Sequence, residues 1–378
     1  MDFQLTEEQR LIQNMVREFA ETKIKPIAAE IDKNHRWPEE TVKEMGELGI
    51  MGLSLPEEYG GSGGGTISYS IGIEEVSRVC GSHGAILAVH IGAVNGIRFF
   101  GTEEQKKTFI PDLASGRKIA CLCMTEPGAG TDAAAQQTKA VREGDHYVIN
   151  GSKIFITNGP VGGTYVVLCM TDPSRGVKGI TAFIVPRETP GLRIGQTEDK
   201  LGIRASVTSE LIFENMKVPV ENRLGEEGQG FMIVMKVLDI GRIGMASQAL
   251  GIAEGALAAA VEYVKERKQF GKPIAANQGI QWMIADMATK IEASRLLIRK
   301  AAVLADEKSR ISVEAAMAKL VASRTAMEVA SDAIQLHGGI GYTTSYPVER
   351  FLRDAKITEI YEGTSEVMKM VISGTVLA

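Results

Sequence analysis

The sequence contains few cysteines and histidines, and neither residue type has the spacing of a metal site. Its 378 residues include only 4 cysteines and 5 histidines. Four cysteines are too few for a disulfide framework in a chain of this length. Cys121 and Cys123 form a C-x-C pair, but their apolar neighbours favour core positions. The histidines do not have the H-E-x-x-H spacing of zinc enzymes. A serine-hydrolase triad built on a G-x-S-x-G motif is likewise not predicted. We therefore predict that the protein holds no metal.

Blocks of like charge and long apolar runs are also missing. The formal net charge is -5, and the basic residues are scattered among acidic ones, which does not favour nucleic-acid binding. No apolar run approaches the length of a membrane span. The N-terminal stretch MDFQLTEEQR lacks the basic start and apolar core of a signal peptide. We expect no membrane attachment and a cytoplasmic location, or the mitochondrial matrix if a transit peptide has been removed.

Residues 1–118 have the pattern of a helical domain. Two stretches in this segment fit capping boxes, in which a threonine and a glutamine three residues later satisfy the first backbone N–H groups of a helix. One is formed by Thr6 and Gln9, and the other by Thr102 and Gln105. We predict that helices begin directly after both threonines.

Residues 119–225 and 226–378 have different patterns. The first segment contains short runs rich in Val, Ile, Thr and aromatics, such as TYVVLCM and ITAFIV, separated by Gly and Pro turns, which is typical of an antiparallel β domain. The second segment has long runs with few helix breakers and is predicted to form a helical bundle. One apolar stripe at helical spacing consists of Ile243, Ala246, Leu250, Ala253, Leu257 and Val264. The whole chain is therefore predicted to be an α+β multidomain protein that is mainly α.

The stretch IACLCMTEPGAGTDAAA contains an incomplete dinucleotide-binding fingerprint. Gly128, Gly130 and Ala133 match G-x-G-x-x-A, which requires a helix directly afterwards within a β-α-β unit. The following stretch, TKAVREGDHYVING, has the pattern of a hairpin instead. A nicotinamide-binding Rossmann domain is therefore disfavoured.

Three carboxylates lie in the stretch ITEIYEGTSEV: Glu359, Glu362 and Glu366. A solvated face of one helix would explain such a cluster, but Gly363 disfavours a continuous helix. The threonine or serine after it could cap a new helix, with Glu366 in its first turn. Glu359 and Glu366 thus have structural explanations. Glu362 has none, and we expect it at a junction beside an aromatic ring and a glycine.

Five stretches occur in the order and at the spacing typical of one enzyme family: CMTEPGAGTD, NGSKIFITNG, ERKQFGKPI, QLHGGIGY and RDAKITEIYEGTSEV. In these stretches the chain resembles the acyl-CoA dehydrogenases, and GSKIFITN, EGQGF and GRIG are similar to the short-chain, butyryl-CoA type. The resemblance implies an N-terminal helical domain, a middle β domain and a C-terminal four-helix bundle. It also implies FAD between the β domain and the bundle, and a homotetramer in which some bundle residues reach a neighbouring subunit's FAD.

The resemblance carries FAD-binding roles to particular positions, with Phe155 standing where the family has tryptophan. These positions are Leu122, Met124, Thr125, Gly130, Thr131, Phe155, Ile156, Thr157, Arg267, Phe270, Gln278, Gln335, Gly339, Thr364 and Glu366. The hydroxyls of Thr125 and Thr157 are expected to bond the edge of the isoalloxazine ring, tuning a cofactor whose redox chemistry is its own.

The resemblance also implies which residues bind the acyl-CoA substrate: Thr131, Asp239, Arg242, Glu362 and Gly363. Of these, Asp239 and Arg242 match positions that contact its CoA part. Glu362 matches the catalytic base that removes the α proton while a β hydride goes to flavin N5, giving a trans-2-enoyl-CoA. Some family branches place the base just before the bundle arginine, but that position here is Gly241. A nearby helix start would lower the pKa of Glu362 and exclusion of water by bound substrate would raise it, and we expect the second effect to dominate when the acyl chain closes the site.

Several alternatives share these motifs. Electrons are expected to pass to an electron-transferring flavoprotein, whereas an acyl-CoA oxidase would pass them to oxygen. A branched or cyclic acyl-CoA substrate and reduction of an enoyl-CoA in the reverse direction are also compatible with the sequence. A non-catalytic helical scaffold would bind no flavin, and a nicotinamide enzyme would use Gly128 and Gly130 instead.

Overall fold

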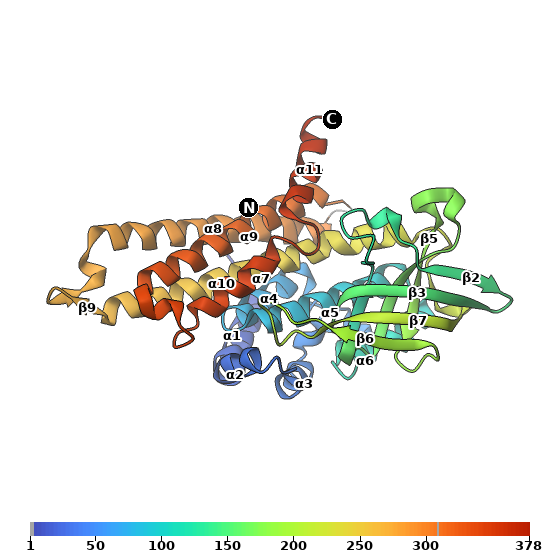
Figure 1. Ribbon diagram of the computed structural model, residues 1–378, viewed down its shortest axis with the longest axis horizontal. Coiled ribbons are helices and arrows are strands. Elements are labelled where there is room, and N and C mark those ends of the chain that lie inside the picture. The colour runs from blue at the N-terminus through green and yellow to red at the C-terminus, as the bar shows by residue number, and fades with distance from the viewer. Residues whose placement is uncertain (1–3, 308–309) are drawn as a thin grey trace.

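The computed structural model describes residues 4–307 and 310–378, which form a helical N-terminal part, a β sheet and a set of long C-terminal helices (Figure 1). Both predicted capping boxes are confirmed: Thr6 and Thr102 each accept a hydrogen bond from the backbone N–H of a glutamine at 3.2 Å. The helices of the N-terminal part are α1 (Glu7–Phe19), α2 (Ala28–Lys33), α3 (Glu39–Glu47), α4 (Gly65–Ser77), α5 (Gly81–Phe100) and α6 (Glu103–Ala114).

The first eight β strands form one sheet, which lies at the opposite end of the molecule from a short hairpin at residues 268–273 (Figure 1). Its strands are β1 (Ala120–Cys123), β2 (Lys139–Glu143), β3 (His146–Thr157), β4 (Thr164–Met170), β5 (Ile180–Pro186), β6 (Leu192–Thr197), β7 (Thr208–Pro219) and β8 (Arg223–Leu224). The order is β6-β7-β3-β2-β4-β5-β8, and β1 pairs with β4. The pairing is antiparallel except that β4 runs parallel to β1 and, at one residue pair, to β2.

Two predictions within the β domain are confirmed. The stretch after the G-x-G-x-x-A match forms the antiparallel β2–β3 hairpin, so the helix that a dinucleotide fold requires is replaced by strands. Cys121 and Cys123 are fully buried in the sheet's hydrophobic core, as expected of structural cysteines.

The C-terminal helices are α7 (Gly230–Glu266), α8 (Gln278–Glu307), α9 (Ser312–His337), α10 (Val348–Thr358) and α11 (Ser365–Val376). Helix α7, yellow in Figure 1, runs from the β domain to the far end of the bundle, where the hairpin of β9 (Lys268–Gln269) and β10 (Lys272–Pro273) follows. Its predicted apolar stripe is buried except for Leu257, which is partly exposed. Helices α4 and α5 pack against α7 as well, so the N-terminal part and the bundle share one hydrophobic core.

Two properties of the described residues bear on function. Within residues 4–307 and 310–378, no helix combines the length and apolar character that a bilayer crossing requires. In the same part of the chain, no three His, Cys, Asp or Glu side chains are grouped so that they could hold a metal ion.

Candidate active site

Glu362 lies in the short turn between α10 and α11. Helix α10 ends at Thr358, and the hydroxyl of Thr364 caps α11 by accepting the N–H of Val367 at 3.3 Å. The backbone of Glu362 has φ 51° and that of Gly363 has φ 101°. A left-handed conformation at a residue other than glycine is strained, and it persists only where the surroundings hold it. The predicted junction at Gly363 and the new helix after it are therefore confirmed.

The carboxyl group of Glu362 faces the backbone of α7. A Cβ atom placed on Gly241 would lie 2.2 Å from Glu362 Oε2, so the glycine is what admits the carboxyl group there. The residue as a whole is partly exposed, but its Oε2 atom is buried and has no hydrogen-bond partner in the described part of the chain. A buried carboxylate without a partner is costly unless a ligand or a proton satisfies it.

Burial raises the pKa of Glu362 to about 7, and the charges of Arg242 and Lys319 each lower it. Burial by protein atoms alone produces this rise, and the further effect of bound substrate stays a prediction. A carboxyl group with a pKa near neutrality is suited to general-base catalysis, because it is available as a base and can still hold a proton.

Lys319 on α9 binds the turn between α10 and α11 that carries Glu362. The side chain is fully buried, and its Nζ donates a hydrogen bond of 2.5 Å to the carbonyl oxygen of Gly363. Burial lowers the pKa of Lys319 to about 8, while the charge of Glu362 raises it. This residue was not predicted from the sequence. The available signal was a lysine within the alanine-rich stretch AAMAKLVAS, at a position where the helix faces the core.

Tyr361 anchors the same turn to α7 and α5. Its hydroxyl donates to Oε1 of Gln248, and Nε2 of Gln248 donates to the carbonyl oxygen of Gly81 at 2.8 Å. Tyr361, Gln248 and Lys319 together bind the turn to three separate helices. This multiple attachment explains how Glu362 keeps its left-handed backbone.

Asp239 and Arg242, which are predicted to contact the CoA part of the substrate, are buried and paired with each other. Arg242 donates to Asp239 Oδ1 at 2.9 Å, and Ser312 donates to Asp239 Oδ2 at 2.7 Å. The Nε atom of Arg242 is buried without a hydrogen-bond partner among the residues described. The arginine therefore lies close enough to influence Glu362 and retains one donor, although its role toward the thioester stays a prediction.

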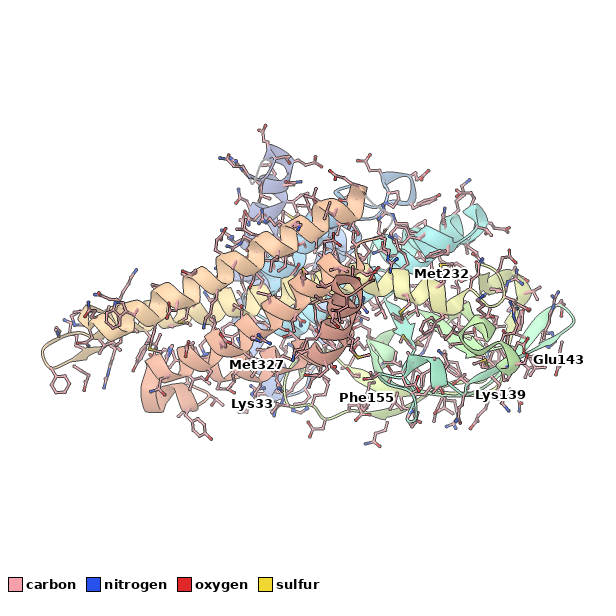
Figure 2. All side chains as sticks on the ribbon, turned by 90° about the horizontal axis from the view of Figure 1, so that it is seen from above. Lys33, Lys139, Glu143, Phe155, Met232 and Met327 are labelled. Carbon is pink, nitrogen blue, oxygen red and sulfur yellow. The ribbon has the colours of Figure 1, made fainter. Side chains whose placement is uncertain are left out.

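The predicted flavin positions of the β domain form one partly open face. Leu122, Met124, Thr125 and Thr157 are partly exposed, and Phe155 is 58% exposed. In Figure 2, Phe155 lies where the β domain faces the C-terminal helices. Apolar side chains for the ring faces and hydroxyls for the polar edge fit an isoalloxazine ring. Gly130 and Thr131 are exposed in the same loop.

Two details change the picture drawn from sequence. Ile156 is 2% exposed and belongs to the sheet core, so its side chain does not line the open face. The loop after β1 is tied down by fully buried Lys153, whose Nζ donates to Met124 O at 3.0 Å and to Glu126 Oε1 at 2.7 Å. This pair was not identified from the sequence. A buried lysine is held by such pairing.

The remaining predicted flavin positions lie in two other places. Arg267 precedes the β9–β10 hairpin, Phe270 lies in its turn and Gln278 begins α8, all at the end of the molecule away from the sheet (Figure 1). Phe270 is 99% exposed. Gln335 and Gly339 lie near the same end. They flank His337, whose ring stacks on Tyr263 of α7 at 4.3 Å. Thr364 and Glu366 lie beside Glu362 at the start of α11, where Thr364 serves as the cap.

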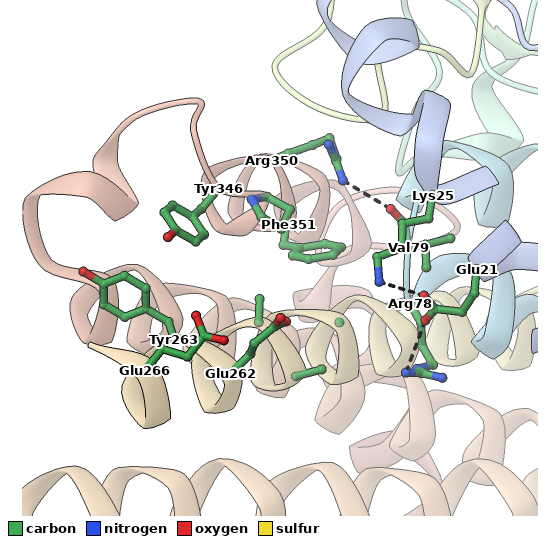
Figure 3. A pocket seen from close by; sticks show the side chains of 14 residues that line it. Glu21, Lys25, Arg78, Val79, Glu262, Tyr263, Glu266, Tyr346, Arg350 and Phe351 are labelled. Atoms are coloured by element: carbon green, nitrogen blue, oxygen red, sulfur yellow. Dashed lines mark hydrogen bonds and ion pairs between the residues drawn. The ribbon is translucent and has the colours of Figure 1, made fainter. Parts of the chain in front are cut away.

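A cavity of about 270 Å³ lies elsewhere (Figure 3). It is lined by residues of the N-terminal part, of the C-terminal half of α7 and of the start of α10. Two of its basic side chains have partners: Arg78 lies 3.8 Å from Glu21, and Arg350 donates to the carbonyl oxygen of Val79 at 3.3 Å. Its lining includes none of the residues predicted from the motifs. We therefore locate the site at Glu362, where strain, burial and an unsatisfied oxygen coincide.

Comparison with known families identifies the relatives of this arrangement. Models described as the N-terminal, middle and C-terminal domains of acyl-CoA dehydrogenase match residues 6–117, 121–216 and 228–377. The chain belongs to the acyl-CoA dehydrogenase family. The family resemblance, the three-part architecture and the assignment as an oxidoreductase of the flavoprotein class are thereby confirmed.

Individual relatives of this acyl-CoA dehydrogenase cover its full length. A short-chain specific acyl-CoA dehydrogenase of Clostridium acetobutylicum is 58% identical, with 100% of both chains covered. The structure of butyryl-CoA dehydrogenase from Megasphaera elsdenii has a TM-score of 0.98 and 49% identity, again covering 100% of both chains. A chain in a structure described as the electron transferring flavoprotein of Acidaminococcus fermentans has a TM-score of 0.99 and 54% identity over 100% of both chains.

Proposed function

We propose that this acyl-CoA dehydrogenase oxidises short straight-chain acyl-CoA thioesters to trans-2-enoyl-CoA, with Glu362 as the base. The observation that carries the proposal is the buried Oε2 atom of Glu362, which lacks a hydrogen-bond partner within the described residues, on a carboxyl group whose pKa is about 7. The similarity to short-chain and butyryl-CoA enzymes supports the chain length.

The reaction breaks two C–H bonds and forms one C=C bond. Glu362 takes the α proton on its carboxylate, and FAD, when bound, supplies the acceptor for the β hydride. The charge that develops on the thioester carbonyl requires fixed donors, and we assign one of these to the backbone N–H of Glu362. Lys319 and Tyr361 hold the turn, so the carboxylate and this N–H keep a constant geometry.

We place FAD between the β face around Phe155 and the bundle. The positions at the other end of the molecule, Arg267, Phe270, Gln278, Gln335 and Gly339, are proposed to contact FAD of a neighbouring subunit in a homotetramer. The distance between the two sets in Figure 1 and the full exposure of Phe270 support this assignment. Sedimentation analysis of the holoenzyme tests the tetramer, and a monomer with full FAD content would contradict it.

We also propose that residues 1–118, 119–225 and 226–378 are the three domains. The first boundary falls directly before β1, and the second falls between β8 and α7, which supports the division. The electron acceptor is proposed to be an electron-transferring flavoprotein, supported by the similarity to a chain from a structure of that name. A cytoplasmic location is proposed because the 58% identical relative is bacterial.

One spectroscopic experiment tests the proposed function. Purified protein is expected to be yellow, and anaerobic butyryl-CoA is expected to bleach the flavin absorption. A colourless protein that does not bind added FAD would favour a non-catalytic scaffold, and nicotinamide binding without flavin would favour a nicotinamide enzyme. Stoichiometric peroxide during aerobic turnover without a flavoprotein acceptor would identify an acyl-CoA oxidase instead.

A further inference from the structure

In helix α7, the lack of a side chain at Gly241 and Gly244 lets groups from other segments contact the backbone. Gly241 and Gly244 are three residues apart, so they lie on the same side of the helix. A Cβ atom on Gly241 would lie 2.2 Å from the carboxyl oxygen of Glu362. A Cβ atom on Gly244 would lie 2.1 Å from the hydroxyl oxygen of Tyr69 and 2.8 Å from its ring carbon Cζ. The carboxyl group and the phenol ring therefore contact consecutive turns of one helix face.

Tyr69 is held firmly in this place. The side chain is 0% exposed, and its hydroxyl donates to the carbonyl oxygen of Ala88 on α5 at 3.2 Å. The neighbouring Ser70 shares a hydrogen bond of 2.8 Å with Ser247, which joins α4 directly to α7 beside the ring. Because interiors are close-packed, a ring fixed by two neighbouring helices acts as a rigid wall.

The direction of the substrate along α7 follows from what covers each side of Gly241. Toward the N-terminus of α7, Val234 and Leu238 share a hydrophobic cluster with Leu122 and Met124 of the proposed flavin face. Toward the C-terminus, Tyr69 covers Gly244. An acyl chain that passes from the flavin side across Glu362 therefore continues toward Tyr69.

We propose that Tyr69 forms the end of the acyl pocket and limits the enzyme to short acyl chains. This inference rests on the proposed function and names the residue that sets its substrate class. Three residues of helix advance about 4.5 Å along the axis, which is roughly three single carbon–carbon bonds. A chain with its α carbon at Glu362 reaches the phenol ring after about that number of bonds. Because the hydroxyl is already donated to Ala88, the wall suits an apolar chain end.

The test compares butyryl-, hexanoyl- and octanoyl-CoA as substrates of the FAD-loaded protein. The unmodified enzyme should have a kcat/KM for octanoyl-CoA at least tenfold below that for butyryl-CoA. Tyr69→Ala should raise the octanoyl to butyryl ratio at least tenfold, because each added methylene in an apolar pocket changes discrimination measurably. Tyr69→Leu serves the same purpose if the alanine variant does not fold, and FAD content and thermal unfolding check both.

Two matched controls make the result specific. Tyr69→Phe keeps the ring and should leave the ratio unchanged, so a change equal to that of alanine would overturn the role of ring bulk. Tyr165→Leu alters an equally buried tyrosine in the β core and should also leave the ratio unchanged, so a shift there would show a general effect of destabilisation.

The outcomes separate this inference from the proposed function. Bleaching of the wild-type flavin by butyryl-CoA with an octanoyl to butyryl ratio that stays within twofold in folded Tyr69→Ala or Tyr69→Leu overturns only the role of Tyr69. Equal use of octanoyl- and butyryl-CoA by the unmodified enzyme overturns it as well. Failure of every thioester to bleach the flavin in wild-type protein overturns the proposed function itself.

Discussion

Two buried carboxyl groups, Glu74 on α4 and Glu362 at the α10–α11 turn, have a similarly raised pKa but different surroundings. Burial raises the pKa of each to about 7. Glu74 lies 3.4 Å from Arg295 and 3.9 Å from Arg299, in a network of charges that joins α4, α7 and α8. Glu362 Oε2 has no hydrogen-bond partner within residues 4–307 and 310–378.

The comparison shows that a shifted pKa alone does not identify a catalytic residue. Removal from water raises the pKa of any buried carboxyl group, whether its role is structural or chemical. Glu74 is paired with cations that hold helices together, and its backbone lies inside a regular helix. Glu362 combines burial with a strained backbone and an unsatisfied oxygen, and this combination is typical of a functional site.

Replacing Glu362 with glutamine should produce the largest effect on activity. The amide cannot accept the α proton, so the rate of flavin reduction by butyryl-CoA should fall by about 10²–10⁴, the usual contribution of a general base. Stopped-flow absorption of the FAD-loaded variant measures this rate. Glu359→Gln, which removes a neighbouring carboxylate paired with Lys356, should retain the wild-type rate. Near-normal reduction by Glu362→Gln would place the base elsewhere.

Removing a cation from the Glu74 network should affect stability and leave catalysis intact. Arg295→Met deprives Glu74 and Glu254 of their shared partner, and breaking a buried ion pair costs about 3 kcal/mol. Chemical denaturation should show this loss, while flavin reduction per folded molecule should stay within about twofold of wild type. An equal loss of rate and stability would contradict the division between the two regions.

Lys319→Met should move the titration of the catalytic base. The variant loses the hydrogen bond to Gly363 O and a positive charge that lowers the pKa of Glu362. The apparent pKa in the pH profile of flavin reduction should rise by about one unit, with a rate loss of about fivefold at pH 7. Lys319→Arg should restore part of the shift because the charge returns. A pH profile that does not move would reduce Lys319 to a packing role.

The last expected effect is a pH-dependent gain in stability in Glu362→Gln. The folded pKa is about 7 against an ordinary value of 4.5, so the folded state holds a proton that the unfolded chain releases between these values. The stability contributed by this proton is complete below pH 4.5 and is lost as the pH rises toward 7. Thermal unfolding should therefore show the variant about 3 kcal/mol more stable than wild type at pH 8, and nearly equal at pH 4.5. A stability difference that is the same at both pH values would contradict burial as the cause.

Several features were predictable from sequence because they depend on neighbouring residues. The capping boxes at Thr6 and Thr102, the hairpin after the false fingerprint and the cap at Thr364 all rest on hydrogen bonds between residues close in the chain. Glu362 was singled out by the glycine after it, whose conformational freedom ends one helix and permits another.

Other features required the folded chain. The partners of the catalytic turn come from distant segments: Lys319 lies 44 residues from Gly363, and Gln248 lies 113 residues from Tyr361. The parallel pairing of β1 with β4 and the burial of Ile156 also join or cover segments that local pattern does not relate. No periodicity in the sequence specifies such pairs.

The sequence by itself determined many of the helices and strands and the family, and it singled out Glu362 as the candidate base, because short-range hydrogen bonding and motif order suffice for these. Only the tertiary structure decided that Glu362 is buried against Gly241, that Lys319 faces it and that Tyr69 stands one helical turn beyond. The reason is that acidity and pocket depth depend on how much water is excluded. Water is excluded from a position by all the segments that pack around it, so burial cannot be read from any one segment of the sequence.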